Sequence, residues 1–123
     1  MSIVSFEEFT HELTDGEMGA VEVLSKCLLS NKGKDLSRTN KYISEKLKLQ
    51  YGLNLSGARI RKVVNFIRTK GLIPNLIATS KGYFVSDDED ELRKYIYSLR
   101  QRARAILHVA TVMEDHLNLK TQQ

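Results

Sequence analysis

Apolar residues recur along the first two thirds of the chain with the spacing of amphipathic helices. Three stretches, 15–30, 38–51 and 57–70, each carry a stripe that repeats every three or four residues. The expected inward positions are Ala20, Val21, Leu24, Cys27 and Leu28 in the first stretch, Tyr42, Ile43 and Leu47 in the second, and Ile60, Val63, Val64 and Ile67 in the third. The pattern predicts three helices around one core.

Residues typical of helix ends border these stretches. Thr14 and Glu17 have the spacing of a capping box, in which each side chain satisfies a backbone amide of the other. Ser37 and Ser56 are the expected N-caps of the second and third helices. Gly52 is suited to end the second helix in a left-handed conformation.

The helical pattern then gives way to two short β-type runs. Leu76–Thr79 and 83–85 are rich in β-branched and aromatic residues, and Ser80-Lys81-Gly82 lies between them. This arrangement predicts a β-hairpin with glycine at the turn. Because neighbouring strand residues point to opposite faces, one of Tyr83 and Phe84 is expected in the core and the other exposed, with Tyr83 a candidate contact near the turn.

A single long helix is predicted from 87 to about Leu117, with Ser86 and Glu89 as its capping box. Its apolar residues keep the alternating four- and three-residue spacing of a coiled-coil seam about 40 Å long. So small a domain cannot cover that seam, so we expect a second copy to pack on it, as a parallel, antiparallel or domain-straddling dimer. An intramolecular clamp is the alternative. The expected oligomerisation residues are Leu99, Ala103, Ile106, Ala110, Met113 and Leu117.

Length and composition indicate one small globular domain. The 123 residues, of which 41% are hydrophobic, divide into an N-terminal arm or short helix (1–13), a helical domain with a hairpin (14–86) and the long helix (87–123). The chain has neither a membrane-spanning apolar run nor the features of a secretory signal. Its one cysteine, Cys27, is expected in the core. We expect a soluble, reduced, cytoplasmic protein.

The net charge of +4 conceals a strong asymmetry. Residues 1–25 contain six acids and no base, whereas 26–85 contain thirteen Lys and Arg against two acids, a balance of +11. Residues 86–123 are close to neutral, at −1. The basic centre of the chain is therefore where a polyanion would bind.

The third predicted helix has the features of a helix that enters a DNA groove. Its first residues are small, which lets the backbone approach, and basic or amide side chains follow. Residues 56–70 contain five bases and no acid, and Lys81 stands at the hairpin tip. The candidate DNA-binding residues are Ser56, Gly57, Arg59, Arg61, Lys62, Asn65 and Lys81.

Three stretches together resemble the small winged helix-turn-helix proteins of phages and prophages. They are 42–47 (YISEKL), 55–68, in which Ser56-Gly57 and Ile60-Arg61 match an SG-x-x-[IV]-R helix start, and 79–84 (TSKGYF), which matches an SKGY[FY] wing. The resemblance covers residues 18–105 and departs from the pattern in a longer linker, 48–54. It implies a mainly α fold with a small β-hairpin, winged helix-turn-helix with a long C-terminal helix. It also implies binding of double-stranded DNA in transcription regulation or phage DNA metabolism, in the host cytoplasm if phage-encoded. The seam of the last helix adds the expectation of a homodimer.

Nothing in the chain predicts catalysis. There is no nucleophile triad, phosphate-binding loop or zinc spacing, and His11, His108 and His116 lack ligand spacing. The acids at 87–91 suit a helix start better than a nuclease metal site. We therefore expect no enzyme activity, cofactor, metal or small-molecule substrate. The rival class is a protein–protein adaptor that uses a winged helix without DNA. The low aromatic content, 7%, disfavours binding of RNA or single strands.

Overall fold

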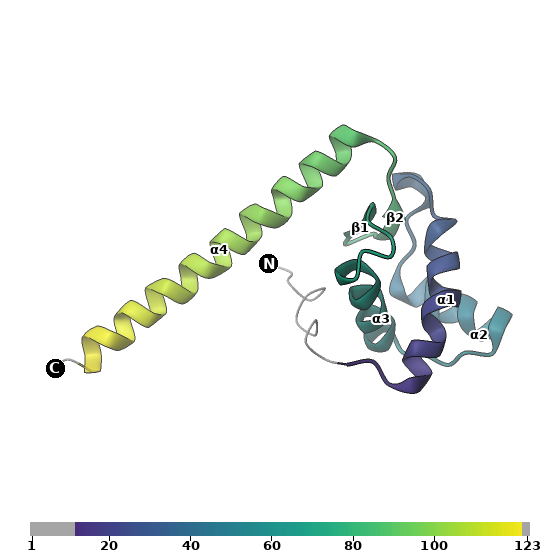
Figure 1. Cartoon of the computed structure of the whole chain (residues 1–123), viewed down its shortest axis with the longest axis horizontal. Coiled ribbons are helices and arrows are strands. Elements are labelled where there is room, and N and C mark those ends of the chain that lie inside the picture. The colour runs from purple at the N-terminus through teal and green to yellow at the C-terminus, as the bar shows by residue number, and fades with distance from the viewer. Residues whose placement is uncertain (1–11, 122–123) are drawn as a thin grey trace. The chain divides into compact units, whose positions relative to one another are not determined.

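The computed structural model of the chain describes residues 12–121, which divide into two units between Asp87 and Asp88 (Figure 1). The first contains α1 (Asp15–Leu29), the 3-10 helix η2 (Lys34–Leu36), α2 (Asn40–Tyr51), α3 (Gly57–Thr69) and a hairpin of β1 (Leu76–Thr79) and β2 (Gly82–Val85). The second is one helix, α4 (Glu89–Thr121). The described chain is thus mainly helical with one small hairpin and a long final helix, as predicted. The expected arm falls almost wholly outside the described residues.

The predicted start of α1 is confirmed, whereas α2 begins later than predicted. At α1, the Thr14 hydroxyl accepts a hydrogen bond from the Glu17 amide (3.2 Å). At α2, Thr39 is the N-cap in place of Ser37, whose hydroxyl donates to a carbonyl of η2 (2.7 Å). Arg38 is the reason, because its backbone pairs with Tyr83 and is held out of the helix.

Backbone hydrogen bonds connect the hairpin to the segment between α1 and α2. β1 and β2 are antiparallel, with Ile77 opposite Phe84. Along β2, the Tyr83 amide and carbonyl both bond to Arg38 (2.9 and 3.1 Å), and the Val85 amide donates to the Asn31 carbonyl (2.8 Å). Gly82 has a φ of 115°, and a Cβ there would collide with the Arg38 carbonyl. The close approach of this segment therefore requires glycine at the start of β2.

The core lies where α1, α2, α3 and the hairpin meet. Most of the predicted inward positions are buried, Cys27 among them at 7% exposure. Tyr42 is an exception, because 45% of it is exposed. The expectation for the hairpin is also wrong, since Tyr83 and Phe84 are both buried. The Tyr83 hydroxyl donates a hydrogen bond to Asn40 Oδ1 (2.7 Å). This hydroxyl therefore bonds within the first unit and is not presented at its surface.

The cap of α4 also differs from the prediction. Asp88 Oδ1 accepts from the Asp90 and Glu91 amides (2.9 and 3.2 Å). Ser86, the expected cap, is buried, and both its amide and its carbonyl bond to Asn75. Because Ser86 belongs to the hairpin unit, the helix begins after it, and it ends four residues beyond Leu117. Its 33 residues span about 50 Å, and none of them is buried.

None of the helices within residues 12–121 combines the length and the apolar character needed to span a membrane.

Candidate nucleic-acid interface

The first turn of α3 lies at the surface and begins at a serine cap, as predicted. The Ser56 hydroxyl accepts a hydrogen bond from the Arg59 amide (3.3 Å), and Ser56 and Ala58 are exposed. The first amides of a helix have no partner within it, so this turn offers donors to an anion. Gly57 is half-buried, and a Cβ there would lie at an ordinary 3.7 Å from Asn40 Cβ. Packing against α2 therefore does not require glycine.

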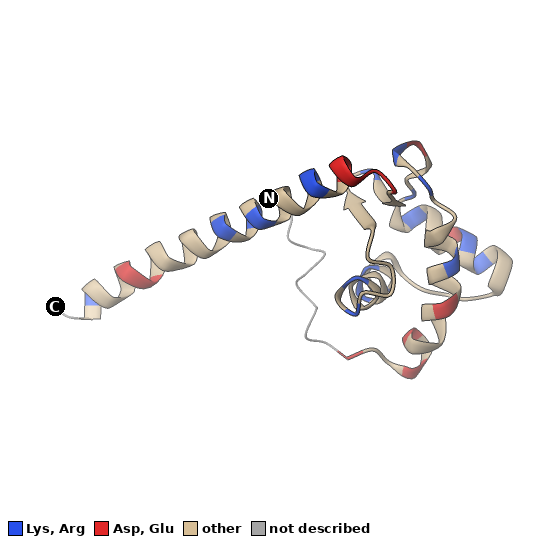
Figure 2. Ribbon diagram, turned by 45° about the horizontal axis from the view of Figure 1, so that its top comes forward, with Lys and Arg blue, Asp and Glu red and all other residues tan. Residues whose placement is uncertain are grey.

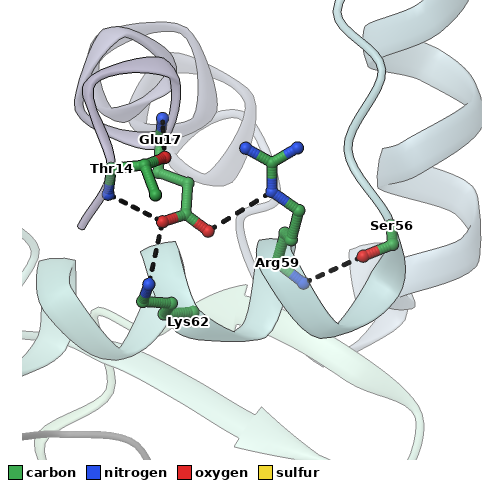
Figure 3. A network of polar contacts seen from close by, with 5 residues as sticks. All are labelled: Thr14, Glu17, Ser56, Arg59 and Lys62. Carbon is green, nitrogen blue, oxygen red and sulfur yellow. Dashed lines mark hydrogen bonds and ion pairs between the residues drawn. The ribbon is translucent and has the colours of Figure 1, made fainter. Parts of the chain in front are cut away.

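Two of the predicted contacts, Arg59 and Lys62, bind one buried carboxylate on α1 (Figure 3). Arg59 Nε lies 3.4 Å from Glu17 Oε2, and Lys62 Nζ lies 2.9 Å from Glu17 Oε1. The same Oε1 atom accepts a hydrogen bond from the Thr14 amide (2.9 Å), and Glu17 as a whole is 2% exposed. One acidic side chain therefore engages two of the cations of α3 and joins α3 to the start of α1.

These surroundings keep Glu17 ionised. Burial alone would raise its pKa, but the contacts with the Thr14 amide, Lys62, the Thr14 hydroxyl and Arg59 together outweigh burial. The pKa of Glu17 consequently falls from 4.5 to about 2. At neutral pH the three charged groups thus carry one net positive charge rather than the two expected from Arg59 and Lys62 alone.

The ion pairs leave Arg59 more available to a ligand than Lys62. The Lys62 side chain is only 17% exposed, and its ammonium group points to α1. The Arg59 side chain is 45% exposed and contacts Glu17 through Nε, and its two terminal nitrogens point away from the carboxylate (Figure 3). A guanidinium group held in this way can still bind a phosphate through those nitrogens.

Asn65 is not on an open surface, contrary to the prediction. Helical phase places it on the side of α3 away from Ile60 and Ile67, which is why it was expected to be accessible. Its exposure is 2%, and neither Oδ1 nor Nδ2 has a hydrogen-bond partner among residues 12–121. A covered amide cannot reach the edge of a base, so Asn65 is not available as a base contact in this structure.

Arg61 and Lys81 keep their charges free of acidic partners within residues 12–121. Arg61 is half-buried on α3. Lys81 is exposed at the hairpin tip, where its backbone amide donates to Thr79 Oγ1 (3.1 Å) and so fixes the turn. Of the predicted residues, Ser56, Arg59, Arg61 and Lys81 therefore remain accessible or partly accessible to a polyanion.

Further cations precede α3 in the same unit. They contribute to the basic charge of 26–85 but were not among the predicted site residues. Figure 2 shows Lys and Arg on α2, on α3 and in the loop before α2. Asp and Glu are concentrated on α1, although Asp35 lies in η2 and Glu45 on α2. The additional residues are Lys32, Lys34, Arg38, Lys41, Lys46 and Lys48, of which all but Arg38 and Lys46 are exposed. Arg38 lies over the Tyr42 ring at 5.0 Å.

Glu17 is the residue of this region for which the sequence predicted only a capping role. The capping-box spacing identified its contact with Thr14, and that contact is present. Nothing in the spacing indicates that the same carboxylate reaches α3, more than forty residues away. The one available signal was the charge asymmetry, because the acidic stretch 1–25 precedes the basic stretch 26–85.

The expected oligomerisation residues all lie on α4. Leu99 and Ile106 are half-buried, while Ala103, Ala110, Met113 and Leu117 are exposed. Met113 and Leu117 are 66% and 59% exposed, which is high for large apolar side chains. The single chain therefore leaves the far half of the seam uncovered.

Comparison with protein-family models, with curated proteins and with solved structures finds no match for this chain.

Proposed function

We propose that the chain is a winged helix-turn-helix protein that binds double-stranded DNA as a homodimer and acts by binding rather than by catalysis. Its setting would be transcription regulation or phage DNA metabolism, in the cytoplasm of the cell or host. One observation carries the proposal: the exposed, serine-capped first turn of α3 begins the stretch 56–70, which contains five bases and no acid, in a region of thirteen bases and two acids. Such a surface suits a polyanion.

The arrangement of elements supports the winged helix-turn-helix part of the proposal. α2 and α3 are joined by residues 52–56, because 48–51 of the longer linker expected at 48–54 belong to α2, and the hairpin follows α3. The pairing of Arg38 with Tyr83 fixes the hairpin to the start of α2. Lys81, at the tip, is suited to contact the DNA backbone without reading sequence.

The ion pairs refine the expected roles on α3. Arg59, through its terminal nitrogens, and Arg61 would contact phosphates or bases, and the first-turn amides would hold a phosphate. Lys62 would act chiefly by positioning α3 against α1 through Glu17. A variant that replaces Arg59, Arg61 and Lys62 would therefore also leave the buried Glu17 carboxylate without a counter-ion. Loss of DNA binding in that variant would not identify the interface.

The homodimer part of the proposal rests on α4. Three large apolar side chains of its far half, Ile106, Met113 and Leu117, are half-buried or exposed in the single chain. Burial of each is worth about 1.5–3 kcal/mol, enough in sum to hold a dimer after the cost of association. A dimer that presents two α3 helices would favour a near-palindromic site with half-sites about one helical turn apart.

Arg61→Ala, with Lys26→Ala as the control, tests the interface. Both changes remove one positive charge, but Lys26 lies on α1, where it is exposed and paired with Glu22 (3.4 Å). Fluorescence anisotropy with a short labelled duplex should show weaker binding for Arg61→Ala and a log–log salt slope smaller by about 0.9 per lost phosphate contact. Equal affinity for the two variants would refute the assignment of α3. Elution of the wild type from heparin below about 150 mM salt would favour the adaptor instead.

A further inference from the structure

The seam of α4 alternates large and small side chains. In the seven-residue repeat of a coiled coil, Leu99, Ile106 and Met113 occupy d positions. Ala103 and Ala110 occupy the a positions between them. In a parallel pair of such helices each of these residues faces its own copy, so alanine would face alanine at two layers and leave the core underfilled there. A parallel pair therefore fits this seam poorly.

An antiparallel pair fills the same layers. When one helix is reversed, a positions face d positions, and a twofold axis beside His108 brings the seam residues into register. Met113 and Leu117, which are 66% and 59% exposed in the single chain, are covered in this arrangement. Each alanine meets a large side chain of the second copy. The facing residues are Ala110 and Ile106, Ala103 and Met113, and Leu99 and Leu117.

The side chains that flank the seam also distinguish the two directions. Arg100, Leu107 and Glu114 occupy successive e positions on one side of it. In an antiparallel pair e positions face e positions, so Arg100 lies opposite Glu114 of the second copy and Leu107 lies opposite its own copy. In a parallel pair e positions face g positions, where Arg100 would meet Tyr95 and Glu114 would meet Val109. Only the antiparallel direction brings these opposite charges together across the seam.

Arg100 and Glu114 are suited to such a contact between chains. Both are exposed, and neither takes part in an ion pair among residues 12–121. They are about 21 Å apart along their own helix, so they cannot reach each other within one chain. The same positions fix the register, because a shift of one heptad in either direction would place Leu107 opposite Arg100 or Glu114.

We propose that α4 pairs antiparallel with α4 of a second copy, with the twofold axis beside His108 and Arg100 of each copy on Glu114 of the other. The inference rests on the homodimer of the proposed function and selects one of the arrangements that the sequence left open. The starts of the two α4 helices, to which the first units are attached, would lie about 57 Å apart along the pair. A twofold axis across the helices has the symmetry of a near-palindromic DNA site.

Distances between spin labels in the full-length dimer, measured without DNA, test the direction. Lys94→Cys and His108→Cys place a nitroxide on exposed f positions, opposite the seam, and the native Cys27 is buried. In the antiparallel pair the two labels are separated along the axis by about 42 Å at position 94 and by almost nothing at position 108. A distance at position 94 no longer than that at position 108 would overturn the proposal and retain the homodimer. A monomeric wild type in sedimentation would overturn both.

Exchange of the two charges tests the contact itself. Arg100→Glu should weaken the dimer about two- to thirtyfold in sedimentation equilibrium, since each dimer loses two exposed ion pairs. Adding Glu114→Arg should restore the wild-type affinity, because the pair is rebuilt with its charges exchanged. The control, Arg100→Glu with Asp115→Arg, has the same net charge, but Asp115 lies at an exposed f position away from the seam, so the dimer should stay weak. Equal affinities for the two double variants would refute the contact between Arg100 and Glu114.

Discussion

Glu17→Gln is the change for which the structure gives the sharpest expectation. The substitution keeps the size of the side chain and an oxygen that can accept from the Thr14 amide, but it removes the charge that binds Arg59 and Lys62. Lys62, whose side chain is 17% exposed, then loses its counter-ion in a largely desolvated place. Removing one partner of a buried ion pair costs about 3–5 kcal/mol. We expect about 2–4 kcal/mol here, because Arg59 is half-exposed.

The pKa of Glu17 gives an independent magnitude and a sign. A fall from 4.5 in the unfolded chain to about 2 in the folded chain corresponds to about 3 kcal/mol. Because the folded pKa is the lower one, this stabilisation is complete above pH 4.5 and is lost as the pH falls toward 2. More than half should be gone by about pH 3. The difference between wild type and Glu17→Gln should shrink over the same range.

Urea unfolding at pH 7, 5, 4 and 3 provides the measurement. Near-ultraviolet circular dichroism reports on the first unit through Tyr83, which is buried there. Glu22→Gln is the matched control, since that carboxylate is 82% exposed and pairs only along its own helix. It should unfold like the wild type. A wild-type urea midpoint for Glu17→Gln at pH 7, or a stability deficit that stays constant from pH 5 to pH 3, would refute this role of the Glu17 carboxylate.

Three further outcomes are expected. Gly82→Ala should destabilise the first unit by more than about 2 kcal/mol, because the added methyl group collides with the backbone. Gly52→Ala should cost only about 1 kcal/mol, because Gly52 has a φ of 65° but open space around it. The urea midpoints of the two variants test this difference. Lys81→Ala should weaken binding of all duplex sequences about equally, and a changed preference in a DNA selection would instead assign base reading to the hairpin. Ile106→Asp with Met113→Asp should give a folded monomer that binds DNA weakly, and a wild-type light-scattering mass near 14.1 kDa at high protein concentration would refute the dimer.

Local interactions determined much of the fold, and these were readable from the sequence. The Thr14–Glu17 capping box, the Ser56 cap and the left-handed Gly52 depend on residues no more than a few positions apart. The buried stripe of α3 follows from helical period alone, and Ile60 and Ile67 lie in the core as predicted. The hairpin follows from strand-forming runs on either side of a glycine turn.

The mistaken expectations share a physical cause, which is contact between residues far apart in sequence. Ser37 loses the cap of α2 to Thr39 because Arg38 pairs with the hairpin, more than forty residues later. Tyr83 and Phe84 are both buried because the segment before α2 also packs on β2, so alternation along one strand cannot place them. Ser86 is held by Asn75, which moves the start of α4 to the next available acceptor.

The candidate interface divides in the same way. The sequence by itself determined that the positive charge is concentrated at 26–85 and that α3 starts with small residues and continues with bases, because composition and helical period do not depend on packing. Only the tertiary structure decided which of those bases are accessible. Helix packing brings Glu17 of α1 against α3, where one buried carboxylate binds Lys62 and part of Arg59, and it leaves Arg61 and Lys81 without an acid partner within residues 12–121. An ion pair across such a distance in sequence depends on how two helices meet, and no spacing rule along the chain encodes that.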